Sequence, residues 1–120
     1  MTSLFLLFAS ALFSDSFTLE NKTSFKKIAI QWASSARVAQ ESNESLMQED
    51  PLPKDLYYLH RSSSKVDIPS TASYFRLLVW EGKEKEPHLL TNWVEIVPDK
   101  TYSIKEEHLT PILLMNGMGC

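Results

Sequence analysis

Hydrophobic and polar residues alternate with a period of two over much of the chain, which is the period of a β-strand. The clearest runs are 17–23 (FTLENKT), 27–33 (KIAIQWA) and 93–97 (WVEIV). In the second run, Ile28, Ile30 and Trp32 fit this period better than the helical period of about 3.6 residues. We therefore predict strands over these three segments.

The segment 74–80 (YFRLLVW) is the most apolar one outside the N-terminus. Its two faces are both largely apolar, which is typical of a central strand that is covered on both sides. We predict that it pairs with 93–97 in an antiparallel hairpin, with the charged run 83–86 (KEKE) as a solvated tip that also protects the sheet edge.

The hairpin has one preferred register, in which Trp80 lies opposite Trp93 and Leu78 opposite Glu95. Arg76 then lies diagonal to Glu95, within reach of its carboxylate. A slip of one residue would move every one of these side chains to the other face of the sheet.

Shorter strands are predicted at 56–60 (LYYLH), 65–69 (KVDIP), 101–104 (TYSI) and 111–115 (PILLM). Turn signals separate most of them, among them Pro98-Asp99 and Asn116-Gly117. The region 34–55 differs. Ser34 or Ser35 can cap a short helix, but apolar residues are sparse and two prolines follow, so we predict a long polar connection with about one helical turn.

Seven or eight short strands at this spacing predict an all-β fold, a small antiparallel β-sandwich or a small barrel. In general outline it is similar to the immunoglobulin-like or transthyretin-like sandwiches of secreted proteins. The sequence holds no motif of either family, so the likeness implies nothing about function.

The N-terminus contains an uninterrupted apolar or small-residue run, Leu4–Phe13 (LFLLFASALF). It is shorter than the roughly 20 residues that span a bilayer, so we predict no integral membrane segment, but it has the length of a signal-peptide core. Ser14 and Ser16 place small residues at positions −3 and −1 of a cut after Ser16. We predict a signal peptide over 1–16 and one domain over 17–120, secreted or periplasmic. The run has no preceding Lys or Arg, and a buried N-terminal strand or helix is the alternative.

Charge and cysteine content narrow the set of partners. The 120 residues carry a net charge of −3 and no basic patch, so we predict no nucleic-acid partner. The single cysteine, Cys120, excludes an intrachain disulfide. It leaves open an intermolecular disulfide, with a buried or incidental thiol as the alternative.

No pattern of catalytic or metal-ligating residues stands out. His60, His88 and His108 lack the short spacings of a zinc site. Ser62, Ser63 and Ser64 lie close to His60 and Asp67 in sequence, but no nucleophile elbow G-x-S-x-G is present. Three glycines do not form a phosphate-binding loop. We predict no catalytic residues, no metal and no cofactor.

The best candidate for a binding surface is aromatic. In the predicted register Tyr74, Arg76, Trp80, Trp93 and Glu95 share one face, and Tyr, Trp and Arg are enriched at binding hot spots. The alternative is that these rings fill the core. We predict a secreted or periplasmic, non-catalytic β-sandwich that binds another macromolecule, either a protein or a glycan. Two alternatives stay open: a small secreted hydrolase or carbohydrate-active domain that uses one of the histidines, and a membrane-active or host-directed secreted protein.

Overall fold

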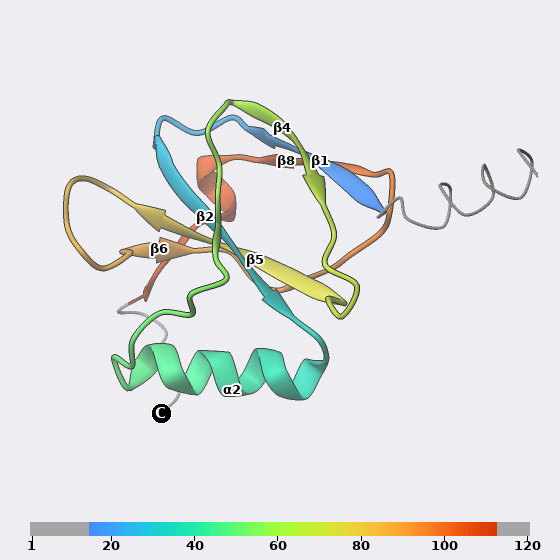
Figure 1. The fold of residues 1–120 in the computed structure, drawn as a ribbon. Helices are drawn as coiled ribbons and strands as arrows, with labels where there is room; N and C mark the ends of the chain where they lie inside the picture. The colour runs from blue at the N-terminus through green and yellow to red at the C-terminus, as the bar shows by residue number, and fades with distance from the viewer. Residues whose placement is uncertain (1–14, 113–120) are drawn as a thin grey trace, which may run out of the picture.

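The computed structural model describes residues 15–112, which form a mostly β-sheet domain with one helix of 12 residues (Figure 1). The prediction of a compact, mostly β structure consistent with a small sandwich is confirmed. The strands are β1 Ser16–Asn21, β2 Lys27–Ala33, β3 Tyr57–Tyr58, β4 Ser63–Asp67, β5 Tyr74–Trp80, β6 Leu89–Leu90, β7 Val94–Glu95, β8 Thr101–Ile104 and β9 Thr110–Pro111. The helix is α2, Ala36–Met47, and a 3-10 turn, η1, covers Glu106–His108.

The strands form two sheets. The smaller sheet has the order β4-β1-β8, and the larger has the order β3-β2-β5-β6-β9, with β7 also paired to β5. Every pair is antiparallel except β1 and β8, which run parallel with Leu19 beside Tyr102. The prediction of a purely antiparallel sandwich is therefore wrong at this pair. The alternation of apolar and polar residues shows which face of a strand is buried, but it does not show whether neighbouring strands run parallel or antiparallel.

The main core lies between the two sheets and consists of the inward-facing residues of the alternating segments. It contains Phe17, Leu19, Ile28, Ile30, Val66, Phe75, Leu77, Val79, Tyr102 and Ile104. Phe17 and Phe75 stack across the interface with their ring centroids 4.8 Å apart. Each such side chain contributes about 1.5–3 kcal/mol when it is fully buried. The period-two pattern of β1 and β2 thus arises from this shared core.

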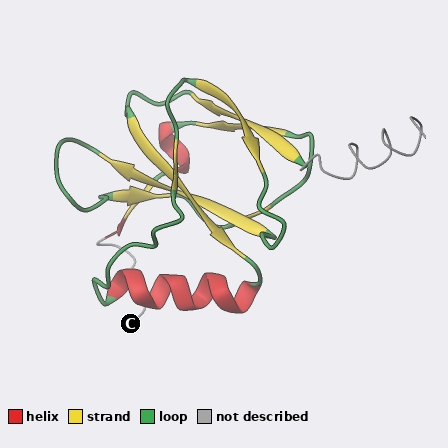
Figure 2. Ribbon diagram, viewed as in Figure 1, coloured by secondary structure: helices red, strands yellow, loops and turns green. Residues whose placement is uncertain are grey.

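A third layer, the helix α2, covers the outer face of the larger sheet, on the side away from β1, β4 and β8 (Figure 2). Ala29, Leu78, Trp80 and Leu90 form a second buried cluster on that face, and Leu46 and Leu52 pack against it. Phe75 to Trp80 are consequently all buried, which confirms the prediction that this strand is covered on both sides.

The prediction of about one helical turn in the region 34–55 is wrong, because α2 has 12 residues. Ser35 is its N-cap, and the Ser35 hydroxyl accepts a hydrogen bond from the Val38 N–H at 3.2 Å. Only Ala39 is fully buried along the helix. The helix therefore lacks the broad apolar stripe that makes an amphipathic helix visible in a sequence.

The predicted register of the hairpin is also wrong. Tyr74 lies opposite Glu95 and Phe75 opposite Val94, so Trp80 does not face Trp93. Instead, Leu78 pairs with Leu90 of β6, a strand that was not predicted. One extra residue is inserted between β6 and β7 at Thr91-Asn92, where the Thr91 hydroxyl accepts from the Leu77 N–H at 2.9 Å.

The observed pairing of β5 with β7 is shifted by four residues from the predicted pairing. Because four is an even number, each side chain stays on the face of the sheet that was predicted for it. Tyr74, Arg76, Trp93 and Glu95 still belong to one face of the larger sheet, the face that α2 covers.

The remaining boundaries differ modestly from those predicted. β3 is limited to two residues, β4 starts two residues before the predicted segment, and β9 is Thr110–Pro111. The apolar run Leu4–Phe13, the rest of the predicted strand 111–115 beyond Ile112, the turn at Asn116-Gly117 and Cys120 lie outside the described residues. Among residues 15–112, no helix has the length and apolar character needed to cross a bilayer.

Candidate functional site

Arg76, in the middle of β5, is fully buried beneath α2, with 1% of its surface exposed. Its Nε donates to Gln31 Oε1 at 2.8 Å, across the β2–β5 pair. Its Nη1 donates to Asn43 Oδ1 at 2.6 Å and its Nη2 to the Ser42 carbonyl at 3.4 Å, both on α2. The guanidinium therefore ties the helix to the sheet.

Trp93 completes this arrangement. The Arg76 guanidinium carbon lies 4.5 Å from the centre of the Trp93 ring, which places a cation over an aromatic face. Trp93 Nε1 donates to Asn43 Oδ1 at 3.0 Å. We call Gln31, Asn43, Arg76 and Trp93 the Arg76 cluster.

All the hydrogen-bond acceptors of Arg76 in this cluster are neutral. No ion pair joins Arg76 to a carboxylate within residues 15–112, and Glu95, predicted within its reach, is exposed and forms none. Burial lowers the pKa of Arg76 to about 10, because the charged form loses its hydration. The side chain still carries its positive charge at neutral pH.

A cavity of about 210 Å³ opens beside the cluster, between α2, the segment 50–53 and the larger sheet. Arg76 and Gln31 contribute the polar part of its wall from the sheet. Its apolar walls are Val38, Leu46, Pro51, Leu52 and Pro53, and the exposed side chains of Glu41 and Asp50 also line it.

The structure separates the residues of the predicted aromatic face. Trp80 is 2% exposed and belongs to the second buried cluster, while Tyr74 and Trp93 are half-buried and Glu95 is exposed. The Trp80 ring lies 4.7 Å from Lys27 Nζ, and Trp80 Nε1 donates to the Lys85 carbonyl at 3.1 Å. Arg76 and Trp93 come together, but in a covered position, and Trp80 is not available at the surface.

Two other aromatic residues are at the surface. Tyr57 and Tyr58 on β3 are 40% and 39% exposed. The Tyr58 ring packs on Trp80 at 5.8 Å between centroids. Sequence analysis placed both tyrosines in a strand without singling them out as exposed.

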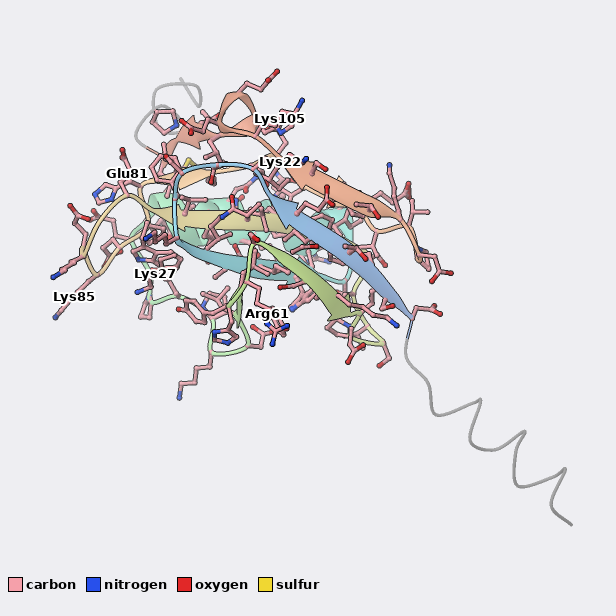
Figure 3. The ribbon with its side chains drawn as sticks, turned by 90° about the horizontal axis from the view of Figure 1, so that it is seen from above. Lys22, Lys27, Arg61, Glu81, Lys85 and Lys105 are labelled. Carbon is pink, nitrogen blue, oxygen red and sulfur yellow. The ribbon has the colours of Figure 1, made fainter. Side chains whose placement is uncertain are left out.

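Tyr57 also lines a surface hollow of about 270 Å³ between β3 and β4, which we call the β3–β4 hollow. The other residues that line it are His60, Arg61, Ser63, Ser64 and Lys65. Its wall thus contains two cations, one histidine and no carboxylate. Arg61 projects on the side of the molecule opposite to Lys22 and Lys105 (Figure 3).

The histidines lie in three different parts of the fold. His60 lines the β3–β4 hollow, His88 precedes β6 with its Nδ1 4.0 Å from Glu84 Oε2, and His108 accepts a hydrogen bond from the Lys105 N–H at 3.0 Å. No hydrogen bond joins His60 to Ser63 or Ser64, and no group of three metal-ligating side chains gathers in the part of the chain that the structure describes.

Comparison with known proteins gives no relative: no protein family, no curated protein and no solved structure matches this chain.

Proposed function

We propose that this chain is an exported, non-catalytic protein, secreted or periplasmic, that binds another protein through the β3–β4 hollow, which Tyr57 lines, and through the exposed Tyr58 on the other face of the same edge strand. The apolar run Leu4–Phe13 supports export. The single observation that carries the binding proposal is the exposure of Tyr57 beside Arg61 in that hollow.

Tyr58 is suited to recognition because its ring is already held in place by the fold. Tyr58 rests on the buried Trp80, and Lys27 Nζ lies 5.9 Å from the Tyr58 ring centre. A side chain that is ordered before binding loses little conformational entropy on binding. Tyrosine and arginine are also the residue types that most often provide binding energy at protein interfaces.

The charge of the hollow indicates the chemistry of the partner. Arg61 and Lys65 line it, and no carboxylate does. Although the whole chain has a net charge of −3, this surface is locally basic. It therefore suits a partner that presents an acidic side chain or an acidic segment.

The backbone adds a second means of contact. β3 is the edge of the larger sheet and β4 is the edge of the smaller one. Edge strands have unpaired N–H and C=O groups and accept an added strand from a partner. A segment that pairs with β4 would pass alongside the hollow.

The test is affinity capture from the exported protein fraction, with the purified chain as bait. The double substitution Tyr57→Ser and Arg61→Ser should remove the specific partner, with a loss of affinity of about tenfold or more. The matched control is Val97→Ser. Among residues 15–112, Val97 is the exposed large hydrophobic residue besides Tyr57 and Tyr58. It follows β7, which pairs with β5, whereas β3 pairs with β2 on the other side of the larger sheet. Equal recovery with both variants would refute the proposal, and specific retention of a glycan alone would replace the protein partner.

A further inference from the structure

We infer that the cavity beside Arg76 is a binding site for a small carboxylate that carries a short apolar chain. This site is separate from the β3–β4 hollow: it lies under α2, against the outer face of the larger sheet. The inference does not depend on the proposed protein partner.

The first argument is the missing counter-ion. Arg76 is a fully buried cation, and among residues 15–112 its side-chain and main-chain acceptors are all neutral. Glu41, a helix carboxylate that lines the same cavity, pairs instead with Arg37 at 3.4 Å. Buried charges in proteins are normally paired, because neutral hydrogen bonds and an aromatic contact replace only part of the hydration that a buried cation loses. A bound anion would supply that compensation.

The second argument is the number of free donors. A guanidinium has five N–H groups, and Arg76 uses three of them within residues 15–112. One N–H remains on Nη1 and one on Nη2. A carboxylate can accept from the two terminal nitrogens of an arginine at once, which is the strongest arrangement between these groups.

The third argument concerns the rest of the wall. Val38, Leu46 and Leu52, together with Pro51 and Pro53, give an apolar surface next to the guanidinium. At about 210 Å³ the cavity is smaller than the roughly 300–1,000 Å³ of sites for drug-sized ligands. The ligand is therefore a few carbons long and binds its apolar part against these side chains.

Glu41 and Asp50 limit the negative charge of a ligand that can bind in this cavity. Both line the same cavity and both are exposed. They repel a ligand with two or more negative charges more strongly than one with a single charge. The site therefore favours a monocarboxylate over inorganic phosphate.

The probe is 3-methylbutanoate, titrated into ¹⁵N-labelled protein and followed by NMR. Saturable shifts are expected at the Arg76 Nε–H and at α2 amides. The neutral analogue 3-methyl-1-butanol and inorganic phosphate should each bind about tenfold more weakly or worse, because each lacks one of the two required features. No saturable shift, equal binding of the alcohol, or tighter binding of phosphate would overturn the inference.

Substitutions then locate the site. Leu52→Trp fills the cavity and leaves the hydrogen bonds of Arg76 in place, and it should abolish the 3-methylbutanoate shifts. If this variant fails to fold, Ser45→Trp serves instead, because Ser45 lines the cavity from an exposed position on α2. The control Val97→Trp should bind like the unmodified protein. Unchanged binding by the cavity-filling variant would show that the ligand sits elsewhere and would refute the site.

Discussion

Asn43 of α2 and Arg76 of β5 are joined by a hydrogen bond of 2.6 Å, and the same Asn43 oxygen accepts a second one from Trp93 Nε1. A single amide oxygen thus connects the helix to β5 and to Trp93, the residue just before β7. This oxygen is also the acceptor closest to a buried positive charge that has no counter-ion within residues 15–112.

The first prediction concerns this oxygen. Asn43→Leu leaves two buried donors without their acceptor and should destabilise the fold by about 2–4 kcal/mol. Asn43→Asp keeps the acceptor and adds the missing negative charge, so it should be at least as stable as the unmodified protein and should no longer bind 3-methylbutanoate. Urea denaturation measures both variants, with the exposed Asn92→Ala as the control. A destabilised Asn43→Asp variant that still binds the carboxylate would contradict the assignment of the charge.

The second prediction separates the two tryptophans that sequence analysis placed on one surface. Trp80→Ala should cost about 3–5 kcal/mol, because Trp80 is 2% exposed and packs against Ala29, Leu78 and Leu90. The exposed Val97→Ala should change stability by less than about 0.5 kcal/mol. Chemical denaturation gives both values. A Trp80→Ala variant as stable as the control would mean that the outer face of the larger sheet is not a core.

The strand β2 was predictable because it buries Ile28 and Ile30 on one face, so that burial determines residue type at every second position, and β5 because both of its faces are buried and apolar. Ile28, Ile30, Leu77 and Val79 meet in the same core. Strand direction and register were not predictable by the same means. The two-residue strand β6 is too short to show a period, and the insertion at Thr91-Asn92 shifts the pairing without leaving an apolar signature.

The helix was missed for a related reason. α2 is fixed to the sheet by Asn43 and the Ser42 carbonyl as well as by Leu46, and polar anchors of this kind do not contribute to a hydrophobic period. Of the predicted binding face, the sequence correctly grouped Arg76 with Trp93 on one side of the sheet. It did not show that a helix covers that side, so the exposed aromatic residues are Tyr57 and Tyr58 instead.

A third prediction concerns pH. Because the pKa of Arg76, though lowered by burial, is about 10, the guanidinium stays charged and 3-methylbutanoate affinity should be constant between about pH 6 and 9. The affinity should fall below about pH 5, because the ligand carboxylate becomes protonated and loses its charge. The other charged side chains that line the cavity are Glu41 and Asp50. It should also fall above about pH 10, where Arg76 loses its proton. Calorimetric titration across this range checks the profile, and an optimum near pH 6.5 would indicate that a histidine holds the ligand.

A fourth prediction concerns the mature N-terminus. Ser16 is the first residue of β1, and its carbonyl accepts a hydrogen bond from the Asp99 N–H at 2.7 Å. The Asp15 carbonyl accepts from the Ile68 N–H at 2.8 Å. A cut after Ser16 would remove both acceptors together with the first residue of the strand. The folded domain would therefore be more stable with a cut upstream of Asp15 than with the cut after Ser16.

The sequence offers such an upstream position. A cut after Ala11 has Ala9 and Ala11 at the −3 and −1 positions, which are the small residues that this kind of cleavage requires. We expect intact-mass analysis of the exported protein to give Leu12 as the first residue. A first residue of Phe17 would instead support the cut after Ser16, and an exported chain that keeps residues 1–11 would contradict export by a cleaved signal.

The most direct test of the proposed function is site-specific photo-crosslinking in the producing cell. A photoreactive phenylalanine analogue is placed at Tyr57, in the β3–β4 hollow, or at Val97, an equally exposed position across the larger sheet. The proposal predicts one discrete protein adduct from position 57, none from position 97, and loss of the position-57 adduct when Arg61→Ser is added. Adducts of equal yield from both positions, or an adduct from position 97 alone, would contradict it.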